Sequence, residues 1–325
     1  MSTIVLSAKV ERWPVAGAFT ISRGARTEAV VVVVEAVADG IIGRGECVPY
    51  ARYGETVEGV VAAIEGVRGI ASREDLARVL APGAARNAID CALWDLEAKR
   101  AGRRVWEIAD LAPLKPVPTC YTLSLDAPEA MAARAREAHA HPLLKIKLGG
   151  GAADAERMRA IRAARPEARL VADANEAWHP DELQHLLAVA AEAQFELIEQ
   201  PLPAGNDGAL AGLKREVPIC ADESAHTADG LAALRDRYDA VNIKLDKTGG
   251  LTGALAMAAE AQRLGFKTMV GCMLATSLAM APATLVAQSA DWVDLDGPLL
   301  LARDRPHGLV YVDGCVSPPT AALWG

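Results

Sequence analysis

The feature that most restricts the fold of this chain is a series of eight short apolar runs between residues 120 and 295. The runs follow one another about every 25 residues, which leaves room for one strand and one crossover helix in each repeat. Such a repeat favours a parallel (β/α) barrel over a doubly wound sheet. The expected strands are Cys120–Leu123, Leu143–Lys147, Arg169–Asp173, Phe195–Glu199, Pro218–Asp222, Ala240–Lys244, Thr268–Gly271 and Asp291–Leu295.

The residues before this series have a different pattern. Strands are expected near 4–13, 29–37 and 41–48, with Asp39-Gly40 as the turn of a hairpin between the last two. A helical pattern over residues 84–100 follows and ends at Gly102, and three prolines punctuate residues 111–119. We therefore expect an α/β protein: an N-terminal α+β capping domain (1–115), a (β/α)7β barrel (116–298) and a C-terminal segment (299–325) that packs back on the capping domain.

Composition restricts the partners of the chain. The formal net charge of −8 and the lack of clustered Lys and Arg argue against nucleic acid. No uncharged apolar stretch is long enough to span a membrane, and Met1–Leu6 runs into polar residues without an apolar leader. Six scattered cysteines without C-x-x-C spacing suit reduced thiols. These features predict a cytoplasmic protein, and a homo-oligomer is compatible with them.

Charged residues close five successive runs. Because parallel barrel strands open at their C-terminal ends onto one face, these side chains should meet at a single mouth. Asp173, Glu199 and Asp222 come from adjacent strands and form an all-oxygen set suited to Mg²⁺. No histidine joins them, which disfavours zinc.

The lysines at the same mouth suggest a reaction. Lys147 and Lys244 lie on the second and sixth of eight strands, and so should face one another across the mouth. A metal that holds a substrate carboxylate stabilises an ene-diolate, and two opposed lysines could remove and return the α-proton on opposite faces. This chemistry requires lysine bases of lowered pKa, whereas Lys145 could stay charged and hold the carboxylate. The alternative is that each charge belongs only to a salt bridge at a strand end.

Several motifs extend beyond these charges and together support a family resemblance. The chain resembles the enolase superfamily, in the muconate-lactonizing-enzyme subgroup that has a K-x-K motif on the second barrel strand, and within it the dipeptide epimerases. The motifs are Gly45–Tyr50, Arg52–Glu55, Pro82–Ala88, Lys145–Lys147, Asp173–Glu176, Glu199–Leu202, Asp222–Ser224, Asn242–Gly250 and Asp294–Pro298.

The resemblance implies a role for each matching residue. Lys147 and Lys244 match the acid/base lysines, and Lys145 matches their electrostatic partner. Asp294 and Asp296 match a D-x-D that holds the substrate α-ammonium group, as two carboxylates can. It further implies one Mg²⁺ per subunit, held by Asp173, Glu199 and Asp222. The implied reaction is epimerisation of a dipeptide at its C-terminal residue, from L-Ala-L-Glu to L-Ala-D-Glu in murein-peptide recycling.

The residues that would select the substrate are less defined. Arg23 and Arg26 lie in the first loop of the capping domain, and the resemblance implies that one of them pairs with the substrate glutamate. Tyr50 could line the pocket or pack the domain interface, while Cys272 and Met273 occupy a binding segment after strand seven. Two carboxylates are candidates for supporting a catalytic lysine: Glu223, and Asp246 if its strand continues past Lys244.

Three alternatives remain. The first is another activity of the superfamily, such as muconate cycloisomerase or o-succinylbenzoate synthase, which has no need of an ammonium-binding D-x-D. The second is a dipeptide epimerase with a different side-chain preference. The third is a non-catalytic metal-binding barrel, which would not need lysines opposed across the metal.

Overall fold

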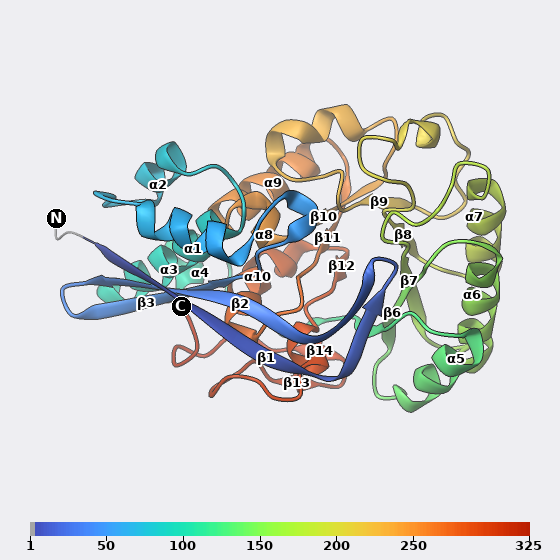
Figure 1. The fold of residues 1–325 in the computed structure, drawn as a ribbon, viewed down its shortest axis with the longest axis horizontal. Helices are drawn as coiled ribbons and strands as arrows, with labels where there is room; N and C mark the ends of the chain where they lie inside the picture. The colour runs from blue at the N-terminus through green and yellow to red at the C-terminus, as the bar shows by residue number, and fades with distance from the viewer. Residues whose placement is uncertain (1–3) are drawn as a thin grey trace.

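A parallel barrel forms the larger part of the molecule (Figure 1). The computed structural model describes residues 4–325; Met1–Thr3, part of the stretch expected to carry no leader, lie outside the described residues. Eight parallel strands lie side by side in chain order, and Cys120 N donates to Val293 O at 2.8 Å, which joins the two end strands. This confirms the predicted barrel. Its strands are β5 (Tyr121–Leu123), β6 (Leu143–Lys147), β7 (Arg169–Asp173), β8 (Leu197–Glu199), β9 (Ile219–Ala221), β10 (Ala240–Ile243), β11 (Lys267–Val270) and β12 (Trp292–Val293).

Helices cover the outside of the barrel, but two of the strand connections hold only short 3-10 helices, η2 (Gly208–Leu210) and η3 (Ala228–Leu234). The connection after β8 contains Pro201, Pro203 and Gly205, which disfavour a longer helix. The remaining helices of this region are α5 (Pro128–Glu137), α6 (Ala152–Ala164), α7 (Leu183–Glu192), α8 (Leu245–Thr248), α9 (Leu251–Arg263), α10 (Ser277–Val286) and η4 (Ala287–Ser289).

The barrel interior changes from apolar to polar in layers. One apolar side chain from each strand position forms a buried cluster: Cys120, Leu143, Val171, Leu197, Cys220, Ala240, Met269 and Trp292. Because strand side chains alternate with a period of two, the residues two positions later point the same way. These form the next layer: Thr122, Lys145, Asp173, Glu199, Asp222, Asn242, Gly271 and Asp294. The apolar layer thus floors a ring that is almost entirely polar.

The capping domain contributes a long hairpin. β1 (Val5–Ile21) and β2 (Gly24–Ala38) extend further than predicted, and their tip reaches over the barrel beside β6 and β7 (Figure 1). β3 (Ile41–Cys47) completes the sheet after the predicted Asp39-Gly40 turn, where both residues have positive φ. Its helices are η1 (Ala51–Tyr53), α1 (Val57–Gly66), α2 (Arg73–Val79), α3 (Ala84–Ala101) and α4 (Val105–Ile108).

The sheet of the capping domain packs closely on α3. A Cβ atom at Gly45 would lie 2.1 Å from Ala88 O, so this approach requires glycine. The helix ends at Gly102 in the left-handed conformation, as its sequence predicts.

The C-terminal segment contacts both parts of the molecule. The short helix η5 (Gly297–Leu300) leads from the barrel into it, and β13 (Tyr311–Val312) and β14 (Cys315–Val316) then form a small sheet with β4 (Val117–Pro118) at the entry to the barrel. Trp324 Nε1 donates to Cys91 O, and Gly325 N donates to Asp95 Oδ1, both on α3. The return of the segment to the capping domain is therefore direct.

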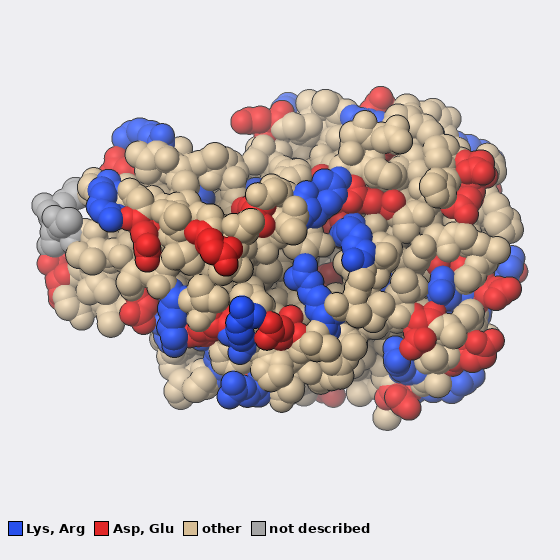
Figure 2. All heavy atoms as spheres, in the orientation of Figure 1, with Lys and Arg blue, Asp and Glu red and all other residues tan. Residues whose placement is uncertain are grey.

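The charged side chains of both signs are interspersed over the face in Figure 2, and several Lys and Arg side chains lie beside a hollow where the capping domain meets the barrel. None of the helices in residues 4–325 is both long and apolar enough to cross a membrane.

Candidate active site

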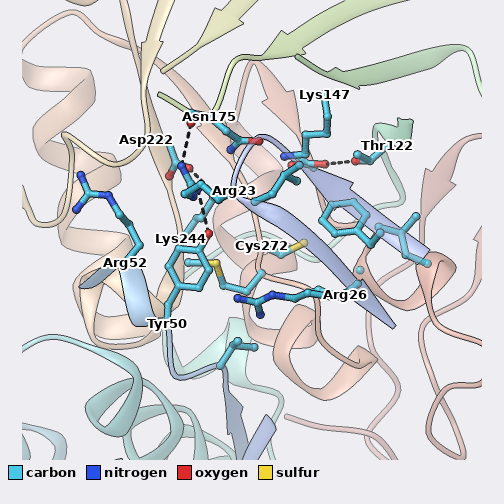
Figure 3. A pocket seen from close by; sticks show the side chains of 18 of the residues that line it. Arg23, Arg26, Tyr50, Arg52, Thr122, Lys147, Asn175, Asp222, Lys244 and Cys272 are labelled. Atoms are coloured by element: carbon cyan, nitrogen blue, oxygen red, sulfur yellow. Dashed lines mark hydrogen bonds and ion pairs between the residues drawn. The ribbon is translucent and has the colours of Figure 1, made fainter. Parts of the chain in front are cut away.

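A cavity of about 450 Å³ lies at the barrel mouth under the capping domain (Figure 3). The capping domain supplies side chains from the β1–β2 hairpin and from the loop after β3, and the barrel supplies Thr122, Lys145, Asp222 and Asp294 of the polar layer. The residues predicted from the sequence that line it are Arg23, Arg26, Tyr50, Lys145, Lys147, Asp222, Glu223, Lys244, Cys272, Met273, Asp294 and Asp296.

Lys145 lies at the centre of the polar layer. Its ammonium nitrogen is 2.6 Å from Glu199 Oε2, 2.7 Å from Asp294 Oδ2 and 3.3 Å from Asp173 Oδ2. The side chain is only 1% exposed. Burial alone would lower the pKa of Lys145, but these carboxylates raise it well above the usual value of a lysine. The sequence-based expectation that Lys145 stays charged agrees with this geometry.

Lys147 and Lys244 occupy opposite sides of the cavity. Lys147 belongs to β6 and Lys244 follows β10, four strands away in the ring of eight. Lys147 Nζ lies 2.6 Å from Asp173 Oδ2, and Lys244 Nζ lies 2.7 Å from Asp222 Oδ2. Both lysines reach the cavity, so a substrate between them would present one face to each.

The protonation of Lys244 differs from the lowered pKa that sequence reasoning requires of a base. Burial alone would lower the pKa of Lys244, but the charges of Asp222 and Glu199 raise it well above the usual value. Burial would raise the pKa of Asp222, yet Lys244 and Lys247 hold it well below its usual range. Without a further positive charge at the carboxylates, Lys244 is an ammonium ion.

The three predicted metal ligands come from adjacent strands as expected. Each of the three carboxylates forms an ion pair with a lysine in this structure. In residues 4–325, no three Asp, Glu, His or Cys side chains are arranged so that they could hold a metal ion without rearrangement. Glu199 nevertheless fits a cation: its Oε2 is buried and lacks a hydrogen bond of normal geometry, although Lys145 Nζ is near. Asn242 Nδ2 orients the other oxygen, Oε1, at 2.7 Å. The all-oxygen set therefore fits a hard cation such as Mg²⁺.

The two aspartates after β12 have different partners. Asp294 pairs with Lys145, whereas Asp296 Oδ2 accepts a hydrogen bond from Thr122 N at 2.6 Å. Burial, and then the negative charge of Asp294, raise the pKa of Asp296 to about 7. A cation in the cavity, such as a substrate ammonium group, would stabilise the ionised carboxylate of Asp296.

The structure distinguishes the two hairpin arginines. Arg23 lies in the turn, and its guanidinium donates to Glu223 Oε1, Tyr50 OH and Asn175 O at 2.7, 3.0 and 3.0 Å. Arg26 was predicted to lie in the loop, but it lies in β2, because β1 continues to Ile21 and β2 begins at Gly24. Its guanidinium lies 5.6 Å from the Tyr50 ring centroid and forms no ion pair with the described residues. Both arginines line the cavity, but Arg23 already pairs with two carboxylates, Glu176 and Glu223.

Tyr50, Cys272 and Met273 line the cavity. Tyr50 also packs edge-on against Tyr53, with ring centroids 5.2 Å apart, and Tyr53 in turn packs edge-on against His226 of the barrel. Cys272 and Met273 follow β11.

Glu223 and Asp246 have partners other than a catalytic lysine in the structure. Glu223 pairs with Arg23 at 2.7 Å and has no direct contact with a lysine in the described residues. Asp246 does not steady Lys244: the strand ends at Ile243 and α8 begins, so the alternation of side chains is lost. Its Oδ1 instead accepts hydrogen bonds from Val48 N and Asn87 Nδ2 of the capping domain.

Asp246 gives a prediction about stability. Burial raises its pKa to about 7, so the folded state binds a proton that the unfolded chain releases near pH 4. The cost of charging this group therefore grows between pH 4 and 7. We expect the unfolding free energy of Asp246→Asn minus that of wild type to rise by about 3 kcal/mol from pH 5 to pH 8. Urea unfolding at both pH values measures this; an equal difference at the two would contradict it.

Other residues of the site were not singled out by sequence reasoning. Asn242 and Gly271 could have been found from the period of two, since each follows an apolar-layer residue by two positions. A Cβ at Gly271 would lie 2.6 Å from Asn242 Oδ1, so glycine leaves room for this side chain. Glu176, bound by both Arg23 and Arg52, and the buried Lys247 carry no such signal.

Comparison with known protein families supports the resemblance to the enolase superfamily that the sequence motifs indicate. Residues 3–109 match the mandelate racemase/muconate lactonizing enzyme N-terminal domain, and residues 128–322 match the enolase C-terminal domain-like model. The chain is 46% identical to the L-Ala-D/L-Glu epimerase of Escherichia coli K12, with 94% of this chain and 96% of that protein covered. It is 44% identical to an N-acetyl-D-glutamate racemase of Pseudoalteromonas, over 90% and 95% of the two chains.

Solved structures extend the comparison. An enolase family member from Agrobacterium tumefaciens, solved with sodium and L-Ala-L-Glu, has a TM-score of 0.97 and 57% identity over 99% of this chain and 100% of that one. A dipeptide epimerase from Methylococcus capsulatus with Mg and L-Arg-D-Lys has a TM-score of 0.90 and 32% identity over 98% and 97%. The chain belongs to the enolase superfamily, within its mandelate racemase/muconate lactonizing enzyme family.

Proposed function

We propose that this protein epimerises dipeptides at the α-carbon of their C-terminal residue, with L-Ala-L-Glu and L-Ala-D-Glu as the main pair. The observation that carries the proposal is the pair Lys147 and Lys244, on opposite sides of one cavity that Asp222 also lines. The other two carboxylates for a cation, Asp173 and Glu199, lie 2.6 Å from the ammonium groups of Lys147 and Lys145 respectively. The chain is an epimerase-type isomerase, as its 46% identical relative is. Its work in murein-peptide recycling in the cytoplasm is part of the proposal.

The reaction needs one proton removed and one returned on the opposite face. One lysine takes the α-proton, and the other, as an ammonium ion, donates a proton from the other side. Lys145, charged and buried, steadies the carboxylates between them. Mg²⁺, held by Asp173, Glu199 and Asp222, would neutralise the substrate carboxylate as its α-carbon loses the proton.

The cavity offers a partner to each charged group of L-Ala-L-Glu. Asp296, with Asp294 beside it, accepts the α-ammonium group at the mouth. Arg26 pairs with the side-chain carboxylate of glutamate, because none of the carboxylates in residues 4–325 forms an ion pair with it. Arg23 is the less suited of the two to this role, because it already donates to Glu223 and to Asn175 O.

A racemase of N-acetyl-glutamate is the second candidate, because a relative with that activity is 44% identical. N-acetyl-glutamate has the same two carboxylates but no ammonium group. It would leave Asp296 without a cation in a buried position, and this favours the dipeptide. Muconate cycloisomerase and o-succinylbenzoate synthase substrates lack the ammonium group as well.

The direct test is incubation of the wild-type protein with Mg²⁺ and L-Ala-L-Glu in D₂O, with the glutamyl α-proton followed by NMR. We expect exchange and the appearance of L-Ala-D-Glu, and at least tenfold slower exchange with N-acetyl-L-glutamate. Faster reaction of N-acetyl-glutamate would favour the racemase. Exchange only on other dipeptides would reject the glutamate assignment, and no exchange on any substrate would reject the epimerase itself.

A further inference from the structure

Lys247 is a buried lysine behind the catalytic face. It lies on α8, three residues after Lys244, and its side chain is fully buried. The ammonium nitrogen donates to Asp222 Oδ1 and Asp222 O, both at 2.6 Å, and to Asn242 O at 2.9 Å. All three of its donors are therefore used by the protein. It does not line the cavity, so it has no part in binding the substrate.

This arrangement divides the carboxylate of Asp222 between two lysines. Oδ1 is fixed by Lys247, and Oδ2 lies 2.7 Å from Lys244 Nζ on the cavity side. A bond at only one oxygen would leave the carboxylate free to rotate about its Cβ–Cγ bond. With both oxygens held, the orientation of Asp222 determines where the Lys244 ammonium lies.

Lys247 also restrains the backbone on which Lys244 stands. Its third acceptor, Asn242 O, belongs to β10 two residues before Lys244. The Asn242 side chain in turn orients Glu199 Oε1. Lys147 has no contact with this set: its carboxylate partner is Asp173, on the other side of the mouth.

We propose that Lys247 is a positioning residue for one face of the reaction: by fixing Asp222 and β10 it holds Lys244, and not Lys147, in place for proton transfer. The inference rests on the proposed function, because it assigns a support to one of two lysines in that mechanism. It predicts that loss of Lys247 affects the two epimers unequally.

The experiment uses Lys247→Met, which keeps an unbranched side chain one atom shorter than lysine and removes its donors. With Mg²⁺ in D₂O, α-proton exchange is measured separately from L-Ala-L-Glu and L-Ala-D-Glu at early times. We expect exchange to fall about 100-fold for the epimer whose α-proton faces Lys244, since a shift of about 1 Å can cost this much. The other epimer should exchange within about fivefold of wild type, with its configuration retained.

A matched control removes a different buried cation. Arg165 is 4% exposed and donates to Ala135 O, Ala138 O and His141 O, outside the cavity. Arg165→Met should lower the melting temperature but leave the ratio of the two exchange rates unchanged. In metal-free crystals of Lys247→Met, the Asp222 carboxylate should be rotated about its Cβ–Cγ bond relative to wild type, and Lys244 Nζ should be displaced with it.

Equal loss for both epimers, or no loss, would overturn the proposal. If Lys247→Met does not fold, the ratio of the two exchange rates is measured in Lys247→Gln, which keeps two donors without the charge. Failure of both to fold while Arg165→Met folds would assign Lys247 a purely structural role. An inactive wild-type protein would instead reject the proposed function, and the crystals would still test the position of Lys244.

Discussion

Replacing Lys244 by alanine is expected to stop net epimerisation while proton exchange continues on one epimer. Lys147 remains on the opposite side of the cavity and can still remove and return a proton on its own face. No group is left to complete inversion, so kcat for epimerisation should fall by about 10⁴. NMR in D₂O measures both quantities in one sample, because exchange with retention and conversion to the other epimer give separate signals.

Lys147→Ala is the matched control, and its expected result is the mirror image: exchange should survive only on the other epimer. Calorimetric titration should show that both variants still bind Mg²⁺, since Asp173, Glu199 and Asp222 are unchanged. Loss of exchange from both epimers in either variant, with Mg²⁺ binding intact, would contradict a mechanism with one lysine for each face. Persistent epimerisation in both variants would assign the lysines to salt bridges alone.

The barrel could be predicted because its strands recur at a regular spacing along the sequence and because several of them end in a charged residue. The same period of two that placed Lys145 with Lys147 also links Leu143 of the apolar layer to Lys145 above it. The two-residue alternation of side chains does not show at which residue a strand ends. Asp246 was placed beside Lys244 on the assumption that β10 continues, but α8 begins there and turns the side chain toward Asn87.

The capping domain was harder to predict at its tip than at its base. The Asp39-Gly40 turn is set by local conformation, which sequence shows. The length of the β1–β2 hairpin is set by contacts with the barrel, such as Ser22 Oγ with Asn175 O, between residues far apart in the chain. The roles of Arg23 and Arg26 could not be separated from sequence for this reason, since the difference between them lies in which carboxylates each one meets.

Arg26→Met is expected to weaken the use of L-Ala-L-Glu specifically. The Arg26 guanidinium lies at the cavity beside the Tyr50 ring and has no carboxylate partner in the part of the chain that the structure describes, so the substrate glutamate is the anion it can pair with. Loss of such a charge pair costs about 2–3 kcal/mol, or about 30- to 150-fold in kcat/KM, mainly through KM. Methionine keeps the apolar wall, so L-Ala-L-Leu should be used as well as by wild type, or better. Steady-state kinetics on both dipeptides provide the ratio.

Arg23→Met tests whether an arginine of this hairpin binds the substrate side chain or holds the hairpin in place. Arg23 holds the hairpin turn to Glu223 and Glu176, so its loss should lower kcat/KM for L-Ala-L-Glu and L-Ala-L-Leu by similar factors. A loss confined to the glutamyl substrate in Arg23→Met, with Arg26→Met unaffected, would reverse the assignment. The two variants remove the same charge from neighbouring positions of one hairpin, so the net charge of the protein cannot explain a difference between them. Such a difference would arise from the partner of each guanidinium, a protein carboxylate for Arg23 and the substrate for Arg26.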